Sequence, residues 1–269
     1  MTDHPTDDVR GRDSSALAAA ADDLRSLHRP GEPLVLVNTW DAASARRVEA
    51  AGGRAIGTSS AAVAASLGVP DDRGAPVAAM FDAVARISAA VALPVTADLL
   101  DGYGLAPDEL VERLLAAGAV GCNIEDSDHL GGRGLVDPQE MADRVAGVRE
   151  AAARAGVPVV VNARVDVLLQ ADPDRSDLQG EIVDRARRYL AAGADCAYPV
   201  RLVDPAMVAT VTGAVPGPVN ANLGPGATVA GVAAAGAARV SIGPTGQAAA
   251  LAAFDDVAAR LLAPAAGRV

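Results

Sequence analysis

Lysine is absent from this sequence, and all 23 basic residues are arginine. A Schiff-base aldolase, a pyridoxal-phosphate enzyme and a Walker-type nucleotide site each depend on a lysine amine, so these mechanisms are excluded. Negative charge that develops during a reaction must then be stabilised by arginine, by backbone N–H groups or by a metal ion.

Aromatic residues are scarce, with two Phe, three Tyr and one Trp in 269 residues. Platforms on which nucleic-acid bases could stack are therefore almost missing. The formal net charge of -11 also opposes binding to nucleic acid or to an anionic membrane. We therefore expect a small-molecule substrate, with no nucleic-acid and no membrane partner.

Long apolar runs are absent too, because no stretch approaches the roughly 20 residues that span a bilayer. The polar start, residues 1–15, lacks the apolar segment of a signal peptide, which predicts a cytoplasmic location. Only two cysteines are present, Cys122 and Cys196, and both lie beside apolar residues. We expect buried free thiols rather than a disulfide or a metal pair.

A repeated pattern fills most of the chain: an Ala-rich helical stretch, a glycine stop and a short apolar run that ends in polar residues. The runs predict eight strands, at 34–41, 55–60, 94–100, 120–126, 158–166, 196–200, 218–222 and 239–244. Helices are expected between them, including 42–51, 75–90, 107–117, 138–155 and 178–192, with an extra N-terminal helix at 15–27 and an eighth helix at 247–262.

Strict alternation of strands and helices implies parallel pairing through right-handed crossovers. Eight repeats in this length favour a closed barrel over an open, doubly wound sheet. The sequence therefore predicts an α/β fold, a single (β/α)8 TIM-type barrel. We expect a disordered or extended leader at 1–14 and one barrel domain at 15–269.

Polar side chains stand where the predicted strands end, and in a barrel these ends gather at one rim, where such enzymes place their chemistry. Asp98 ends the third predicted strand and is followed by the turn Gly102-Tyr103-Gly104, and Glu125 ends the next strand. Adjacent strands lie about 4.8 Å apart, so the two carboxylates can share one ion. Oxygen ligands without a histidine cluster favour Mg²⁺ or Mn²⁺ over zinc. The alternative is that these carboxylates are solvated and cap helices.

The fifth predicted strand contains Arg164, close to its carboxyl end, with Asp166 two residues later. An arginine that faces a barrel mouth is costly unless it meets an anion, which suggests a clamp for a substrate carboxylate, with Asp166 holding the guanidinium. A purely structural Arg164–Asp166 pair is the alternative.

These residues form a set of ordered motifs: Trp40-Asp41-Ala42, Thr58 to Ala62, Ser66 to Asp71, Asp98 before Gly102-Tyr103-Gly104, Asn123 to Asp126, and Asn162-Ala163-Arg164. Between residues 34 and 244 the chain thus resembles the isocitrate lyase/phosphoenolpyruvate mutase superfamily. The resemblance implies Mg²⁺-assisted making or breaking of a bond next to an enolate, either carbon–carbon in lyases or phosphorus–carbon in mutases and hydrolases.

The resemblance also implies roles for single residues. Asp98 would bind the metal directly, while Asp71 and Glu125 would act through coordinated water, and Arg164 would neutralise developing charge. Substrate would be bound by Trp40, Ser59, Ser60, Ala61, Gly102, Tyr103, Arg164 and Asn220. Asp101 completes the predicted metal set, although family members usually carry an acidic residue one position earlier, where this chain has Leu100.

The loop after the fourth predicted strand departs from the family, because residues 127–135 contain neither the catalytic cysteine of the lyases nor a lysine. His129 or Asp128 is the nearest candidate for the missing proton donor. A solvated histidine in a glycine-rich loop is the alternative. Gly131, Gly132 and Gly134 are typical of a mobile lid, and equally of an ordinary connection.

The sequence therefore predicts an enzyme, a Mg²⁺- or Mn²⁺-dependent lyase that acts on a small 2-oxo or 2-hydroxy dicarboxylic acid. Phosphonate chemistry and a non-catalytic oxo-acid-binding barrel remain as alternatives. The resemblance further implies a homo-oligomer, a tetramer or a dimer, often with the eighth helix exchanged between subunits. Burial of that helix on its own barrel is left open.

Overall fold

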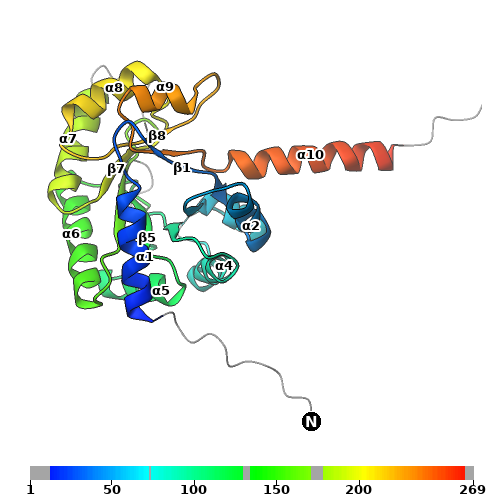
Figure 1. Cartoon of the computed structure of the whole chain (residues 1–269), viewed down its shortest axis with the longest axis horizontal. Helices are drawn as coiled ribbons and strands as arrows, with labels where there is room; N and C mark the ends of the chain where they lie inside the picture. Colours follow the sequence, from blue (N-terminus) through cyan, green and yellow to red (C-terminus); the bar gives the residue numbers. More distant parts are fainter. Residues whose placement is uncertain (1–12, 73, 130–133, 171–177, 264–269) are drawn as a thin grey trace, which may run out of the picture.

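Strands and helices alternate along the chain, as the sequence pattern predicts (Figure 1). The computed structural model describes residues 13–72, 74–129, 134–170 and 178–263. The strands are β1 (Leu34–Leu36), β2 (Asn38–Thr39), β3 (Ile56–Thr58), β4 (Val95–Asp98), β5 (Gly121–Glu125), β6 (Val160–Val165), β7 (Cys196–Pro199), β8 (Asn220–Asn222) and β9 (Arg239–Ser241). The helices are α1 (Ser14–Ser26), α2 (Ala42–Ala50), α3 (Ser60–Leu67), α4 (Val77–Ala89), α5 (Pro107–Ala116), α6 (Pro138–Arg154), α7 (Leu178–Ala191), α8 (Pro205–Ala214), α9 (Val229–Ala234) and α10 (Thr245–Leu262).

All the strand ladders are parallel, in the orders β2-β3-β4-β5-β6-β7 and β1-β9-β8. These two sheets are connected at both ends. The chain passes from β1 to β2 through Val37, and the isolated parallel bridge Ala197↔Val219 joins β7 to the residue before β8. When β1 and β2 are counted as one divided strand, the strand order is that of a (β/α)8 barrel. Each predicted strand is present, with the first divided in two.

The predicted strand 55–60 ends earlier than expected, at Thr58, and is followed at once by a helix, α3. Ser59 caps this helix, since its hydroxyl accepts a hydrogen bond from the N–H of Ala62 at 3.4 Å. Gly68 ends it in the left-handed conformation at φ 70°. The expectation that Ser60 ends a strand is therefore wrong: Ser60 opens a helix at the rim.

Helix α1 packs across the amino ends of β5, β6 and β7. Its residues Leu17, Ala21 and Leu24 are buried, and the Arg25 Nε donates to Asp195, just before β7, at 2.8 Å. The predicted extra helix is present, and it leaves the carboxyl ends of the strands as the accessible rim.

Helix α10 extends away from the body of the protein (Figure 1). Among its described residues only Gln247 is buried, whereas Phe254 is 67% and Leu262 82% exposed. Burial of this helix on its own barrel, one of the two predicted arrangements, is therefore contradicted.

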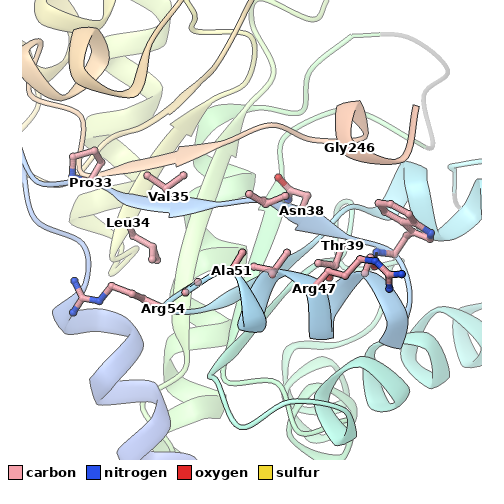
Figure 2. A pocket seen from close by; sticks show the side chains of 15 residues that line it. Pro33, Leu34, Val35, Asn38, Thr39, Arg47, Ala51, Arg54 and Gly246 are labelled. Carbon is pink, nitrogen blue, oxygen red and sulfur yellow. Dashed lines mark hydrogen bonds between the residues drawn. The ribbon is translucent and has the colours of Figure 1, made fainter. Parts of the chain in front are cut away.

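A hollow of about 560 Å³ lies on the outer side of β1 and β2, against α2 and the start of α10 (Figure 2). It is largely apolar, and Val35 and Val37 are partly exposed next to it. In an alternating barrel the last helix covers this flank of the first strand. The hollow is thus the place that α10 leaves uncovered.

Among the described residues, none of the helices combines the length and the apolar character that a membrane span needs.

Candidate active site

Asp98, at the carboxyl end of β4, is held by three donors. The N–H and the hydroxyl of Ser60 lie 3.1 and 3.0 Å from its Oδ2, and the amide Nδ2 of Asn123 lies 3.2 Å from its Oδ1. Ser60 is the first residue of α3, and the N-terminus of a helix favours negative charge. The architecture therefore fixes a carboxylate at the rim.

Asp71 lies on the other side of Ser60, whose hydroxyl is 3.4 Å from the Asp71 Oδ2. Burial and then the negative charge of Asp98 raise the pKa of Asp71. Two neighbouring carboxylates of this kind repel each other, and a bound cation would relieve the repulsion. Sequence reasoning identified both carboxylates but missed that Ser60 bridges them.

Glu125, at the end of β5, is buried between two basic side chains. Its Oε1 lies 2.6 Å from His129 Nε2, and its Oε2 contacts the guanidinium of Arg164. Burial raises the pKa of Glu125 to about 7, although Arg164 and His129 oppose this effect. The hydrogen bond from Glu125 raises the pKa of His129 in turn. The alternative of a merely solvated His129 is therefore contradicted, since the ring is paired with a rim carboxylate.

Arg164 stands beside Glu125 in the strand register and makes a bidentate pair with Asp166. Its Nε and Nη2 donate to Asp166 at 2.6 and 3.0 Å, and the Ser127 hydroxyl donates to the same carboxylate at 2.5 Å. Burial disfavours the charge of Arg164, but Glu125 and Asp166 outweigh it and raise its pKa. The predicted pairing of Asp166 with Arg164 is present. The guanidinium also contacts Glu125, one of the candidate metal-binding residues.

Asp126, next to Glu125, points away from the rim into a buried network. It accepts hydrogen bonds from the Tyr189 hydroxyl at 2.6 Å, from Arg185 Nη1 at 3.0 Å and from the N–H of Asp166 at 2.8 Å. The network ties β5 and β6 to α7 and so supports Arg164 from behind. Nothing in the local sequence indicated this role, because Arg185 and Tyr189 lie about 60 residues away.

The turn after β4 is conformationally strained. Leu100 and Tyr103 have positive φ, at 51° and 55°, although neither is glycine; such residues cost of order 1–3 kcal/mol each and gather at functional sites. The Tyr103 ring is buried edge-on against Phe81. Asp101 is turned toward α6, where Arg144 donates to its carbonyl at 3.1 Å and lies 3.7 Å from its carboxylate.

Trp40 and Asn220, two of the predicted substrate residues, make no direct hydrogen bond to the rim carboxylates of the described chain. Trp40 lines the hollow near Gly246 at the start of α10. Asn220 is fully buried within the barrel, where its Nδ2 donates to the Ser241 hydroxyl at 3.2 Å. The substrate roles of both stay predictions. Residues 130–133, which include Gly131 and Gly132 of the predicted lid, and most of the predicted leader lie outside the described residues.

The metal prediction can be tested against the donor set. Within the described part of the chain, no three His, Cys, Asp or Glu side chains are grouped closely enough to hold a metal by themselves. Mg²⁺ does not require such a cage, since it keeps several waters and takes one or two carboxylates. The crowded pair Asp71 and Asp98, with Glu125 nearby, fits a hydrated magnesium ion of this kind.

The fold and the site together define a class: a (β/α)8-barrel protein with a carboxylate-rich rim suited to a divalent metal and an anionic ligand. Residues 24–262 match the family model described as phosphoenolpyruvate phosphomutase. The chain belongs to this family, which confirms the resemblance seen in its motifs.

Two relatives and one solved structure illustrate the similarity. The chain is 30% identical to the 2-methylisocitrate lyase of Escherichia coli K12, over 74% of this chain and 71% of that protein. It is 36% identical to an uncharacterised protein of Mycobacterium tuberculosis H37Rv, over 82% of this chain and 81% of that one. Among solved structures, 2,3-dimethylmalate lyase, a member of the phosphoenolpyruvate mutase/isocitrate lyase superfamily, superimposes with a TM-score of 0.78 at 25% identity, covering 91% of this chain and 87% of that chain.

Proposed function

We propose that this protein is a Mg²⁺-dependent lyase that cleaves or forms a carbon–carbon bond next to the enolate of a small 2-oxo or 2-hydroxy dicarboxylic acid. The observation that carries the proposal is the Asp71–Ser60–Asp98 contact, with Glu125 and Arg164 beside it. The lyase names of several relatives and the absence of lysine point the same way.

Asp98 would hold the metal directly, with Asp71 and Glu125 binding it through water and Asp101 in its outer surroundings. When bound, Mg²⁺ or Mn²⁺ supplies a Lewis acid that draws negative charge from an oxo acid. The Ser60 N–H is already used by Asp98, so the N–H of Ala61 is the donor left for a substrate oxygen in the first turn of α3. Arg164 would offset the charge that develops on the substrate.

His129 is our candidate for the proton donor, with its neighbour Asp128 as the alternative. The loop in which both stand lacks the cysteine and lysine expected from the family, and the His129 ring reaches the rim at Glu125. General acid catalysis by a positioned group contributes about 10²–10⁴-fold, so His129→Gln should lower the turnover at least about tenfold. An unchanged rate would transfer the role to Asp128 or elsewhere.

Calorimetric titration of Mg²⁺ tests the metal site. Asp98→Asn keeps the shape of the side chain and removes its charge, so we expect a loss of Mg²⁺ affinity of at least about tenfold. Asp108→Asn, which removes an exposed carboxylate paired with Arg154 on the outer surface, serves as the matched control. Equal Mg²⁺ affinity in all three proteins would remove the proposed site.

Two other functions remain as candidates. Phosphorus–carbon chemistry is favoured by the description of the matching family model, and phosphorus NMR of phosphonopyruvate would detect it, because a carbon–carbon lyase leaves that spectrum unchanged. A non-catalytic oxo-acid-binding protein is favoured by the missing cysteine loop. Release of pyruvate or glyoxylate from a panel of 2-oxo and 2-hydroxy dicarboxylates would exclude it.

We also propose that the protein is a homo-oligomer, a tetramer or a dimer, in which α10 of one subunit covers the hollow beside β1 of another. The exposed Phe254, Leu261 and Leu262 and the apolar hollow support this arrangement. Light scattering should therefore report an oligomer for the natural chain and a smaller species for Phe254→Glu, whereas a monomeric natural chain would contradict it. A cytoplasmic location stays part of the proposal.

A further inference from the structure

Arg239 is a buried cation in the interior of the barrel that the proposed chemistry does not use. It opens β9 and is only 1% exposed. Its Nη2 donates to Asn123 Oδ1 at 3.1 Å, but Nε and Nη1 have no hydrogen-bond partner, and Arg239 forms no ion pair with a described residue. A buried charge without a counter-charge costs free energy. We therefore expect a negative charge from outside the chain to compensate Arg239.

The contact between Arg239 and Asn123 crosses the whole barrel. In the strand order, β9 and β5 lie four positions apart in either direction, so the two residues extend from opposite walls. The same Asn123 oxygen accepts from Asn162 Nδ2 at 2.8 Å, and Asn162 Nδ2 lies 3.3 Å from Asn220 Oδ1. Barrel interiors are usually filled by branched aliphatic side chains. Here a layer of amides and one guanidinium lies in their place.

This polar layer contacts the candidate active site at the rim through Asn123. Because the Asn123 oxygen is held by Arg239 and Asn162, its Nδ2 must face outward, and it donates to Asp98 at 3.2 Å. The rim itself carries Asp71, Asp98, Glu125 and other carboxylates against the guanidinium of Arg164. A positive charge beneath this rim therefore partly offsets its negative charge where an anionic ligand has to bind.

We propose that Arg239 is a positioning residue of the active site: it fixes the Asn123 amide toward Asp98, and its uncompensated charge favours doubly charged anions at the rim. The second part rests on the proposed function, because it assumes that an oxo acid binds there. The ligand class it selects is the dicarboxylate dianion rather than the monoanion.

The test compares the natural chain with Arg239→Met, which removes the charge at similar length, and Arg239→Lys, which keeps it. Arg154→Met is the control, since Arg154 is exposed and pairs with Asp108 on the outer surface. Calorimetry with saturating Mg²⁺ measures binding of oxalate, a dianion, and oxamate, the monoanion of the same shape. We expect Arg239→Met to lose about tenfold more affinity for oxalate than for oxamate, and Arg239→Lys to recover most of it. Equal losses for both ligands, or none for oxalate, would overturn the proposal.

A second measurement needs no ligand and separates this proposal from the proposed function. The charge of Arg239 also acts on His28, whose pKa is lowered first by burial and then by Arg239. NMR titration of the His28 ring should therefore give a higher pKa in Arg239→Met than in the natural chain, with Arg154→Met unchanged. If His28 titrates identically in all three proteins, Arg239 carries no uncompensated charge and the proposal fails, whatever oxalate does. If the His28 pKa shifts as expected but the natural chain does not bind oxalate, the proposed function fails. The dianion selectivity, which rests on that function, then fails with it.

Discussion

We predict that the buried ring of His28 contributes less to stability in mild acid, by an amount that follows from its surroundings. The ring follows α1, is buried, and places Nδ1 2.9 Å from the Leu24 carbonyl, while Nε2 has no partner. Burial, with Arg239 nearby, lowers its pKa from 6.5 to about 4. Below pH 6.5 the unfolded chain therefore takes up a proton that the folded chain does not.

The contribution of His28 to stability should fall as the pH drops from 6.5 toward 4. With these two pKa values, linkage gives a loss of about 2 kcal/mol between pH 7 and pH 5, and about 3 kcal/mol by pH 4. His28→Asn removes the titration and keeps an amide that can donate to the Leu24 carbonyl, so any packing cost it brings is the same at every pH.

Urea unfolding of both proteins at pH 7 and pH 5, at one fixed protein concentration, measures the effect. The free energy of unfolding of the natural chain should fall by about 2 kcal/mol more than that of His28→Asn. Other titrating groups are common to both proteins and cancel in the comparison. Parallel pH curves for the two proteins would refute the reasoning, because His28 would then carry the same proton in both states.

Further predictions concern packing and the buried network. Gly121→Ala should destabilise the protein by about 1–3 kcal/mol, because the added methyl would lie 2.8 Å from Leu24 and 3.1 Å from the Val160 carbonyl. Thermal unfolding would show this against Gly213→Ala, in helix α8 with open space around it, which should be neutral or stabilising; equal melting temperatures would contradict it. Tyr189→Phe should cost about 1–3 kcal/mol by leaving Asp126 one donor short, and an unchanged urea midpoint would show that the bond contributes nothing.

Local pattern in the sequence was enough to predict the elements of the barrel. Glycine stops and apolar runs are short-range signals, so all eight predicted strands and the extra helix α1 are present. The boundary at Ser60 was wrong because a serine at the end of an apolar run fits a strand end as well as a helix start. Only the tertiary structure, which places the first turn of α3 beside Asp98, shows that Ser60 starts a helix and does not end a strand.

The candidate site was predictable where residues meet through strand register. Asp98, Glu125 and Arg164 end neighbouring strands, and parallel pairing brings them together. The contacts of Asp126 with Tyr189 and of Arg239 with Asn123 were not predictable in this way. They join residues 63 and 116 positions apart through side-chain directions that no local pattern encodes.

The amino-acid sequence by itself determined the alternation of elements, the carboxylates at the strand ends and the exclusion of lysine chemistry, because each depends on residue type and short spacing. Tertiary structure alone decided that Ser60 lies between Asp71 and Asp98, that Arg239 spans the barrel without a counter-charge, and that α10 leaves the hollow beside β1 uncovered. Each of these depends on the distance between atoms far apart in the chain, which is fixed only when the sheet curves and its interior is packed.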